Sequence, residues 1–102
     1  MVRFDDYVLD TLMRDLVGHD RRFASFLVYV WLVGEEQRRK AAVSISYSEL
    51  SENIGISKSS AQAAVGWLLR RKLISARRAS ATATPAYTTQ TPWKIDYRRG
   101  TH

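Results

Sequence analysis

The sequence places three polar residues, Lys58, Ser59 and Gln62, close together, and each can hydrogen-bond to a nucleic-acid base. A glutamine amide can bond adenine through two atoms at once, a lysine can donate to guanine or to a phosphate, and a serine hydroxyl can donate or accept. With Ala63, these residues are the predicted contacts to DNA bases. The alternative for Lys58 is an ordinary lysine on a solvated surface.

A helix over 58–72 is predicted to present these residues together. Ser57 is suited to cap its start. Apolar residues then recur with the spacing of one helix face, at Ala61, Ala64, Val65, Leu68 and Leu69. The opposite face is expected to carry Lys58, Ser59, Gln62, Ala63, Gly66 and Arg70.

A shorter helix over 47–54 is predicted just before it. Ser46 and Glu49 have the S-x-x-E spacing of a capping box, in which each side chain accepts from the backbone amide of the other residue. Gly55 supplies the left-handed residue that ends this helix. Two helices joined by a short turn that contains glycine form a helix-turn-helix. Because helix starts carry free amides that bind phosphate, the predicted DNA-backbone contacts here are Ser46, Tyr47, Ser48 and Ser57.

Three short strands are predicted at 43–45, 74–78 and 87–91 from β-branched or alternating residues. The small residues at 79–85, ASATATP, are typical of the tip of a hairpin. Four arginines flank this region and are predicted to contact the DNA backbone, with plain surface charge as the alternative: Arg70, Arg71, Arg77 and Arg78.

From position 23 to about position 93, the chain resembles the winged helix-turn-helix domains of bacterial transcription regulators. The resemblance rests on the segments 46–50, 54–60 and 68–74. It implies an α+β fold, with a helical core and a small antiparallel sheet, to which this chain adds an N-terminal helix. It also implies a small regulator that binds double-stranded DNA sequence-specifically, with helix 58–72 in the major groove. The wing, 74–91, would then contact the backbone or the minor groove.

The chain departs from the pattern of that family in two ways, at three positions. Lys72 stands where many members have a glycine, which would give the turn before the wing a different shape. Ala63 and Gly66 are small where relatives often carry long polar or basic side chains. Few direct contacts to bases are therefore expected, and more of the binding is expected to depend on the DNA backbone or on DNA shape.

Two further helices are predicted ahead of the helix-turn-helix, an amphipathic one at 5–17 and a more apolar one at 20–40. The second contains FASFLVYVWLV, which is shorter than the roughly 20 apolar residues that span a bilayer, so a buried helix is expected. Trp31 is assigned to the core, and Trp67 either to the core or to an interface. A helix apolar nearly all round needs cover on several sides, which favours a homodimer built through the first helix and the outer face of the second. Its predicted interface residues are Leu9, Leu12, Met13 and Leu16.

Charge is divided unevenly along the chain. Residues 1–20 hold two basic and five acidic residues, a net charge of −3, whereas the other 82 residues hold 14 basic and five acidic ones, a net charge of +9. A basic body of this kind favours a polyanionic partner. The predicted organisation is an N-terminal helix at 1–19, one domain at 20–95 and a basic flexible tail at 96–102.

Composition argues against several other classes of protein. There is no cysteine, no glycine-rich phosphate loop and no paired-histidine spacing, so no enzyme, metal or cofactor is expected. The lack of cysteine and of a signal peptide favours a cytoplasmic protein without a membrane partner. The competing class is a protein–protein interaction or assembly module that has this fold and does not bind DNA, suggested by the acidic first helix and the small Ala63 and Gly66.

Overall fold

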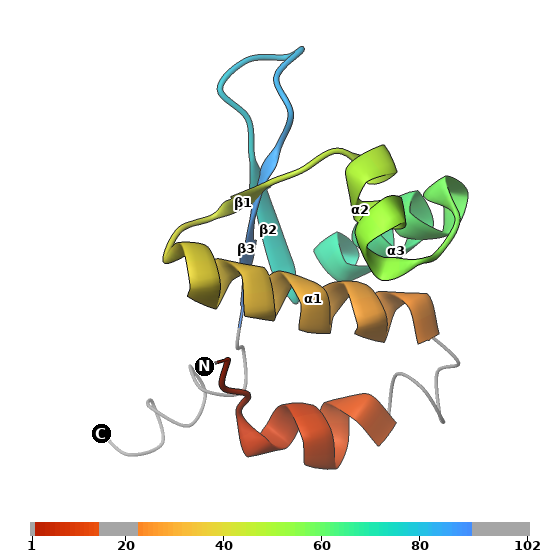
Figure 1. Ribbon diagram of the computed structural model, residues 1–102, viewed down its shortest axis with the longest axis vertical. Helices are drawn as coiled ribbons and strands as arrows, with labels where there is room; N and C mark the ends of the chain where they lie inside the picture. The colour runs from red at the N-terminus through yellow and green to blue at the C-terminus, as the bar shows by residue number, and fades with distance from the viewer. Residues whose placement is uncertain (1, 15–22, 91–102) are drawn as a thin grey trace.

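The structure is a computed structural model that describes residues 2–14 and 23–90 of the chain. Its elements form an α+β fold, as expected, and α1 lies between the N-terminal helical segment on one side and the rest of the protein on the other (Figure 1). In chain order they are the N-terminal helical segment at 6–14, with the π-helix Val8–Leu12 inside it, then α1 (Phe23–Arg39), β1 (Val43–Ser44), α2 (Tyr47–Ile54), α3 (Lys58–Arg70), β2 (Ile74–Arg77) and β3 (Ala86–Thr89).

The observed elements follow the predicted ones closely. The bounds of α2 match the prediction, α3 ends at Arg70 instead of position 72, and each strand is shifted or shortened by one or two residues. The N-terminal helix was expected to be an α-helix, but its described part is wound mainly as a π-helix. The ends predicted at 15–17 and 20–22, and the tail at 96–102, lie outside the described residues.

The three strands form one antiparallel sheet in the order β1-β3-β2. Val43 pairs with Tyr87, and Ile74 pairs with Thr89. Val43, Ile74 and Tyr87 are buried on the inner face, whereas Ser75 on the outer face is exposed, as alternation along a strand requires. The loop between β2 and β3 projects away from the helices (Figure 1).

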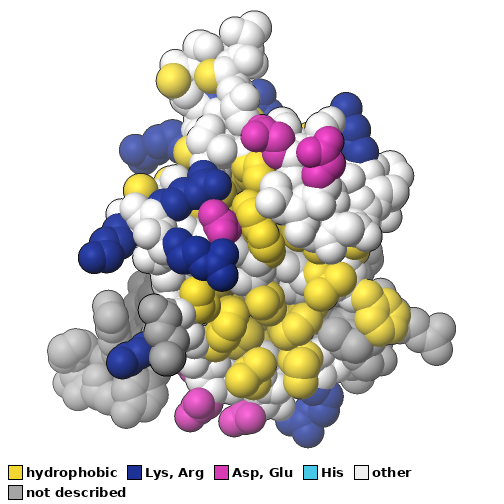
Figure 2. Space-filling view, in the orientation of Figure 1, with side chains coloured by type: hydrophobic (Ala, Val, Ile, Leu, Met, Phe, Trp, Pro, Cys, Tyr) yellow, Lys and Arg dark blue, Asp and Glu magenta, His cyan; other side chains and the backbone are white. Residues whose placement is uncertain are grey.

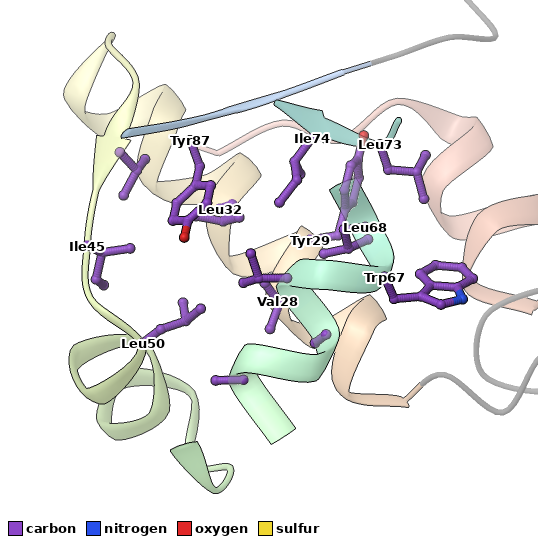
Figure 3. Close-up of a cluster of buried hydrophobic side chains, with 14 of the residues drawn as sticks. Val28, Tyr29, Leu32, Ile45, Leu50, Trp67, Leu68, Leu73, Ile74 and Tyr87 are labelled. Atoms are coloured by element: carbon purple, nitrogen blue, oxygen red, sulfur yellow. The ribbon is translucent and has the colours of Figure 1, made fainter. Parts of the chain in front are cut away.

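Side chains from α1 form the centre of the core. Val28, Tyr29 and Leu32 are fully buried, and they meet Leu50 from α2 and Leu68 from α3 (Figure 3). The expectation of a buried helix is thus confirmed for this face of α1. It is wrong for the start of the helix, because the side chains of Phe23 and Leu27 remain 59% and 46% exposed.

Two side chains of α1 tie the helix to the sheet by hydrogen bonds. The Tyr29 hydroxyl donates to the carbonyl of Gln90 at 2.9 Å. The Glu36 carboxylate accepts from the backbone amide of Thr89 at 2.9 Å and from its hydroxyl at 2.7 Å. Burial, and then the negative charge of Glu36, raise the pKa of Tyr29 well above its usual range, so this hydroxyl stays protonated as a donor.

The N-terminal helical segment packs on α1 along one row of side chains. Val8 and Leu12 are buried in the common core, whereas Leu9 and Met13 are 50% and 40% exposed. The predicted dimer interface is corrected at Leu12, whose side chain is covered by its own chain. The physical reason is that the segment lies at the edge of the molecule, so the other described residues cover only the facing part of its apolar stripe (Figure 1). Leu16 lies outside the described residues.

The chain just before this segment is also fastened to α1. The Arg3 amide donates to Oε1 of Gln37 at 2.7 Å, and Nε2 of Gln37 donates back to the Arg3 carbonyl. Val2 lies against Gly34, with both methyl groups 3.8 Å from the place that a Cβ would take. The N-terminal segment is therefore held on its own α1 by polar contacts as well as by Val8 and Leu12.

The turn after α3 is a Schellman motif with Lys72 in its left-handed position. The amide of Leu73 donates to the carbonyl of Leu68 at 3.0 Å, and the amide of Lys72 donates to that of Leu69 at 3.1 Å. Lys72 has a φ of 59°, a conformation that usually belongs to glycine. The turn thus keeps the shape that a glycine would give, and the expectation of a different shape is wrong. The burial of Leu68 and Leu73 on either side holds the lysine there.

We predict that Lys72→Gly stabilises the protein. A left-handed conformation costs a residue with a Cβ about 1–2 kcal/mol, and the greater freedom of glycine in the unfolded chain returns part of this. The free energy of unfolding, measured with urea, is expected to rise by about 0.5–1 kcal/mol. Lys72→Ala is the matched control, because it removes the long side chain and keeps the Cβ. Equal stability of the two variants would contradict the explanation.

Candidate nucleic-acid interface

Hydrogen bonds fix the start of α2 and also its end, where the turn to α3 begins. At the start of α2, the Glu49 amide donates to Oγ of Ser46 at 3.1 Å, and the Ser46 amide donates to Oε1 of Glu49 at 3.2 Å, which is the predicted capping box. At its end, Gly55 adopts the predicted left-handed conformation with a φ of 88°. Ser51 then donates from its hydroxyl to the carbonyl of Ile56 at 2.6 Å. These contacts set the direction in which α3 leaves α2.

The two faces of α3 are divided nearly as the sequence predicts. Its inner face is buried against the core and consists of Ala61, Ala64, Val65, Trp67 and Leu68. The four predicted base contacts are all exposed on the other side: Lys58, Ser59, Gln62 and Ala63. Leu69 departs from the prediction because it is 36% exposed and lies beyond the edge of the buried stripe.

Arg70 belongs to this exposed face, although it stands at the end of the helix. Its guanidinium Nη1 lies 3.5 Å from the place that a Cβ on Gly66 would take, so the side chain runs back along α3 over the glycine. Side chains four apart lie on one side of a helix and lean toward its start, which explains the direction. The small residue at position 66 therefore leaves room for a guanidinium in the middle of the face. The Gly66–Arg70 spacing is the signal in the sequence that would have indicated this.

Arg71 lies on a different side of α3. Its guanidinium carbon is 5.4 Å from the ring centroid of Trp67, a distance at which a cation is attracted to an aromatic face. Trp67 itself is buried at 9% exposure, so the question of core or interface is resolved in favour of the core. In Figure 3 its indole points away from Leu50 and Tyr87. Arg71 is thus separated from the side of the helix that carries Gln62 and Arg70.

The residues at the helix starts are unequal as candidates for phosphate contacts. The hydroxyl of Ser46 is engaged in the capping box, and that of Ser57 accepts from the amide of Ser60 at 3.0 Å. Tyr47 is half-buried and hydrogen-bonded to Tyr87; burial first, and then Tyr47, raise the pKa of Tyr87 to about 12. Ser48 is exposed and takes no part in either cap.

The hairpin carries its arginines at its base. Arg77 and Arg78 are both exposed, and Nη1 of Arg78 lies 3.5 Å from the carbonyls of both Ala81 and Ala83, at the limit of a hydrogen bond. Arg78 therefore points along its own loop, which itself carries no charged side chain between 79 and 85. Arg77 borders a hollow of about 680 Å³ on the outer face of the sheet, lined by small residues such as Ser75 and Thr88.

The end of α1 brings further basic side chains near the hairpin, which the sequence analysis did not anticipate. Lys40 borders a second hollow of about 340 Å³, which shares Ala42 and Thr88 with the first. Arg38 and Arg39 precede it, and both pair with Glu35, at 2.8 and 3.2 Å. Figure 2 shows Lys and Arg side chains gathered on this side of the hairpin. Only the folding of β1 back onto β3 brings Lys40 to this place.

Acidic side chains limit the basic surface on the other side of the hairpin. Glu49 and Glu52 are exposed on α2, which stands between the hairpin and the start of α3. Acidic groups are visible there in Figure 2. A polyanion that contacts both the hairpin and α3 would have to pass close to these carboxylates, which weakens its binding by repulsion.

Within residues 2–14 and 23–90, no three His, Cys, Asp or Glu side chains lie close enough together to hold a metal ion. None of the helices in the same residues is long and apolar enough to cross a membrane. In comparisons with known proteins, the chain matches no family model, no curated protein and no solved structure.

We predict that the capping box makes stability depend on pH through Glu49. Hydrogen bonds from the amide and then the hydroxyl of Ser46 lower the pKa of Glu49 from its ordinary value of 4.5. A lowered pKa in the folded state gives stabilisation that is present above pH 4.5 and is lost as the pH falls through the folded value. Thermal unfolding should show Glu49→Gln to be less stable than the wild type at about pH 7, and the difference should shrink as the pH falls below 4.5. A difference that persists unchanged in acid would contradict this origin.

Proposed function

We propose that the protein is a small transcriptional regulator that binds double-stranded DNA through a winged helix-turn-helix. In this proposal α2 and α3 are the helix-turn-helix, with α3 in the major groove, and β2 with β3 forms the wing. The observation that carries the proposal is the exposed face of α3, where Lys58, Ser59 and Gln62 stand beside one another while the opposite face is buried in the core. The layout of four helical segments and a three-stranded antiparallel sheet is compatible with it.

Base reading would fall mainly to three side chains of α3. Gln62 has the amide that pairs with adenine, and the guanidinium of Arg70, which lies over Gly66, can pair bidentately with guanine. The methyl group of Ala63 suits contact with the methyl group of thymine. Lys58 stands in the first turn, where its charge opposes the helix dipole, and a nearby phosphate would relieve that repulsion.

Backbone contacts would come from the two ends of the surface. Ser48 and the free amides at the start of α2 suit one phosphate. Arg77 at the base of the hairpin suits another, and Lys40 lies within the same basic region. Arg78 would act mainly by holding the loop, since it points at the carbonyls of Ala81 and Ala83.

The competing function is a protein-interaction module, and two observations favour it. Exposed Glu49 and Glu52 lie beside the supposed DNA surface, and a broad apolar surface covers another side of the molecule. A gel-shift assay against random duplex at low salt separates the two functions, because non-specific binding of a basic DNA-binding protein is strongest there. Selection of bound sites from a random DNA pool then gives the target sequence. Absence of binding in both assays would overturn the proposal.

We predict that Gln62→Ala and the pair Arg77→Ala, Arg78→Ala weaken binding in different ways. Loss of Gln62 is expected to cost about 1–3 kcal/mol at one base position, to relax the preference there and to leave the salt dependence unchanged. Loss of the two arginines is expected to weaken binding to all duplexes alike and to flatten the dependence of affinity on salt, by roughly one counterion for each lost phosphate contact. Fluorescence anisotropy over a salt series with matched and mismatched duplexes measures both.

Arg70→Ala should also weaken binding, because it removes the guanidinium that lies over Gly66 on the exposed face. Arg71→Ala is its matched control. It removes the same charge from the end of α3, but its guanidinium lies over Trp67 and away from the exposed face. We expect a smaller loss of affinity than for Arg70→Ala. If Gln62→Ala alters the salt dependence and leaves the preferred sequence as it was, α3 is not docked with its exposed face in the groove.

A further inference from the structure

Large apolar side chains gather on one surface that the fold leaves uncovered. Four of them are between 40% and 59% exposed, and they come from α1 and the N-terminal helical segment: Leu9, Met13, Phe23 and Leu27. Figure 2 shows hydrophobic side chains joined in one area over these two elements. Large contiguous areas of this kind on small proteins usually mark a contact with another molecule. We call these four residues the apolar surface.

Charged residues border the apolar surface, and their order along the chain indicates what kind of partner can bind there. Asp6, Asp10 and Arg14 are all exposed and recur four residues apart, so they form one row beside Leu9 and Met13. The row is acidic at the start of the segment and basic at its end. Along the lower edge of the apolar area in Figure 2, acidic side chains lie at one end and basic ones at the other.

A contact about a two-fold axis must fit itself, because each copy presents the same residues to the other. When two copies of the segment lie antiparallel, the acidic end of each meets the basic end of the other. Asp6 and Asp10 then approach Arg14 of the second copy twice, once on each side of the axis. A parallel arrangement would oppose like charges.

We infer that a second copy of this chain covers the apolar surface, with the two N-terminal helical segments antiparallel across a two-fold axis. Leu9 and Met13 lie at the centre, and Phe23 and Leu27 of α1 extend the contact. The inferred contact thus keeps the location predicted from the sequence, on the first helix and the outer face of the second, but leaves out Leu12, which is buried in its own chain. The segment remains on its own α1, where Gln37 and Val2 hold it.

The arrangement also leaves the candidate DNA surface free. The inner face of α3 packs toward α1, so Lys58 and Gln62 point away from the side on which the second copy sits. Two α3 helices related by a two-fold axis would read two half-sites of a palindrome. That last step rests on the proposed function, whereas the dimer itself does not, since its test contains no DNA.

The first test measures the dimer dissociation constant of the full chain by sedimentation equilibrium. Leu27→Glu buries a charge in the contact and is expected to raise the constant about tenfold or more, because the apolar contact of one leucine is lost as well. Leu69→Glu is the matched control: this leucine is 36% exposed but lies on α3, away from the apolar surface. Its effect should stay within about twofold. A wild-type monomer at all accessible concentrations, or equal effects of the two changes, would overturn the inference.

The second test addresses the antiparallel order of charges. One variant, Asp6→Lys with Asp10→Lys, makes the row wholly basic, and another, Arg14→Glu, makes it wholly acidic. Each variant alone is expected to dimerise more weakly than the wild type, because like charges meet across the axis. Mixed in equal amounts, they should form the heterodimer in preference to either homodimer, as native mass spectrometry can count. Statistical mixing, or a heterodimer no stronger than the homodimers, would overturn the antiparallel arrangement.

Discussion

The packing of one face of α1 supports every other part of this structure. Val28, Tyr29 and Leu32 are the side chains against which α2, α3 and the sheet all pack, and they are fully buried. The hydroxyl of Tyr29 is a polar group at the edge of this core, and its hydrogen bond to the carbonyl of Gln90 offsets the cost of burying it. Because α1 is the common neighbour, its position decides where both the exposed face of α3 and the base of the hairpin are found. The same helix exposes Phe23 and Leu27 at its start, so one element links the core with the surface on which we place a second copy.

Internal hydrogen bonds decide which polar residues remain available for a ligand. The sequence offers Ser46, Ser48 and Ser57 as equal candidates for phosphate contacts. The hydroxyls of Ser46 and Ser57, however, accept hydrogen bonds from backbone amides at the starts of α2 and α3. Arg71 and Arg78 are similarly occupied, the first by Trp67 and the second by the loop of the hairpin. A group that must break an internal contact gives less net binding energy than one that is free of it. Among the predicted DNA contacts that the structure describes, Ser48, Lys58, Gln62, Arg70 and Arg77 have exposed polar side chains that take no part in these contacts.

Two residues of α3 and the turn after it, Gly66 and Lys72, affect the structure through the positions of their neighbours. Gly66 contributes no side chain to the surface of α3, and for that reason the guanidinium of Arg70 lies over it. Lys72 accepts a left-handed conformation because the burial of Leu68 and Leu73 on both sides of the turn outweighs the cost at one residue.

The sequence alone determined the elements whose stability is local. The capping box at Ser46 and Glu49, the left-handed Gly55 and the apolar repeat of α3 involve residues within a few positions of one another, so their spacing was enough to predict α2, α3 and the outward side of Gln62. Tertiary structure decided whatever depended on contacts between distant segments. Lys40 meets the hairpin only because β1 pairs with β3, and Leu12 is buried while Leu9 is exposed because the other described residues lie on one side of the N-terminal segment. Periodicity shows that a helix has an apolar stripe, but how much of that stripe is covered depends on the shape and number of its neighbours.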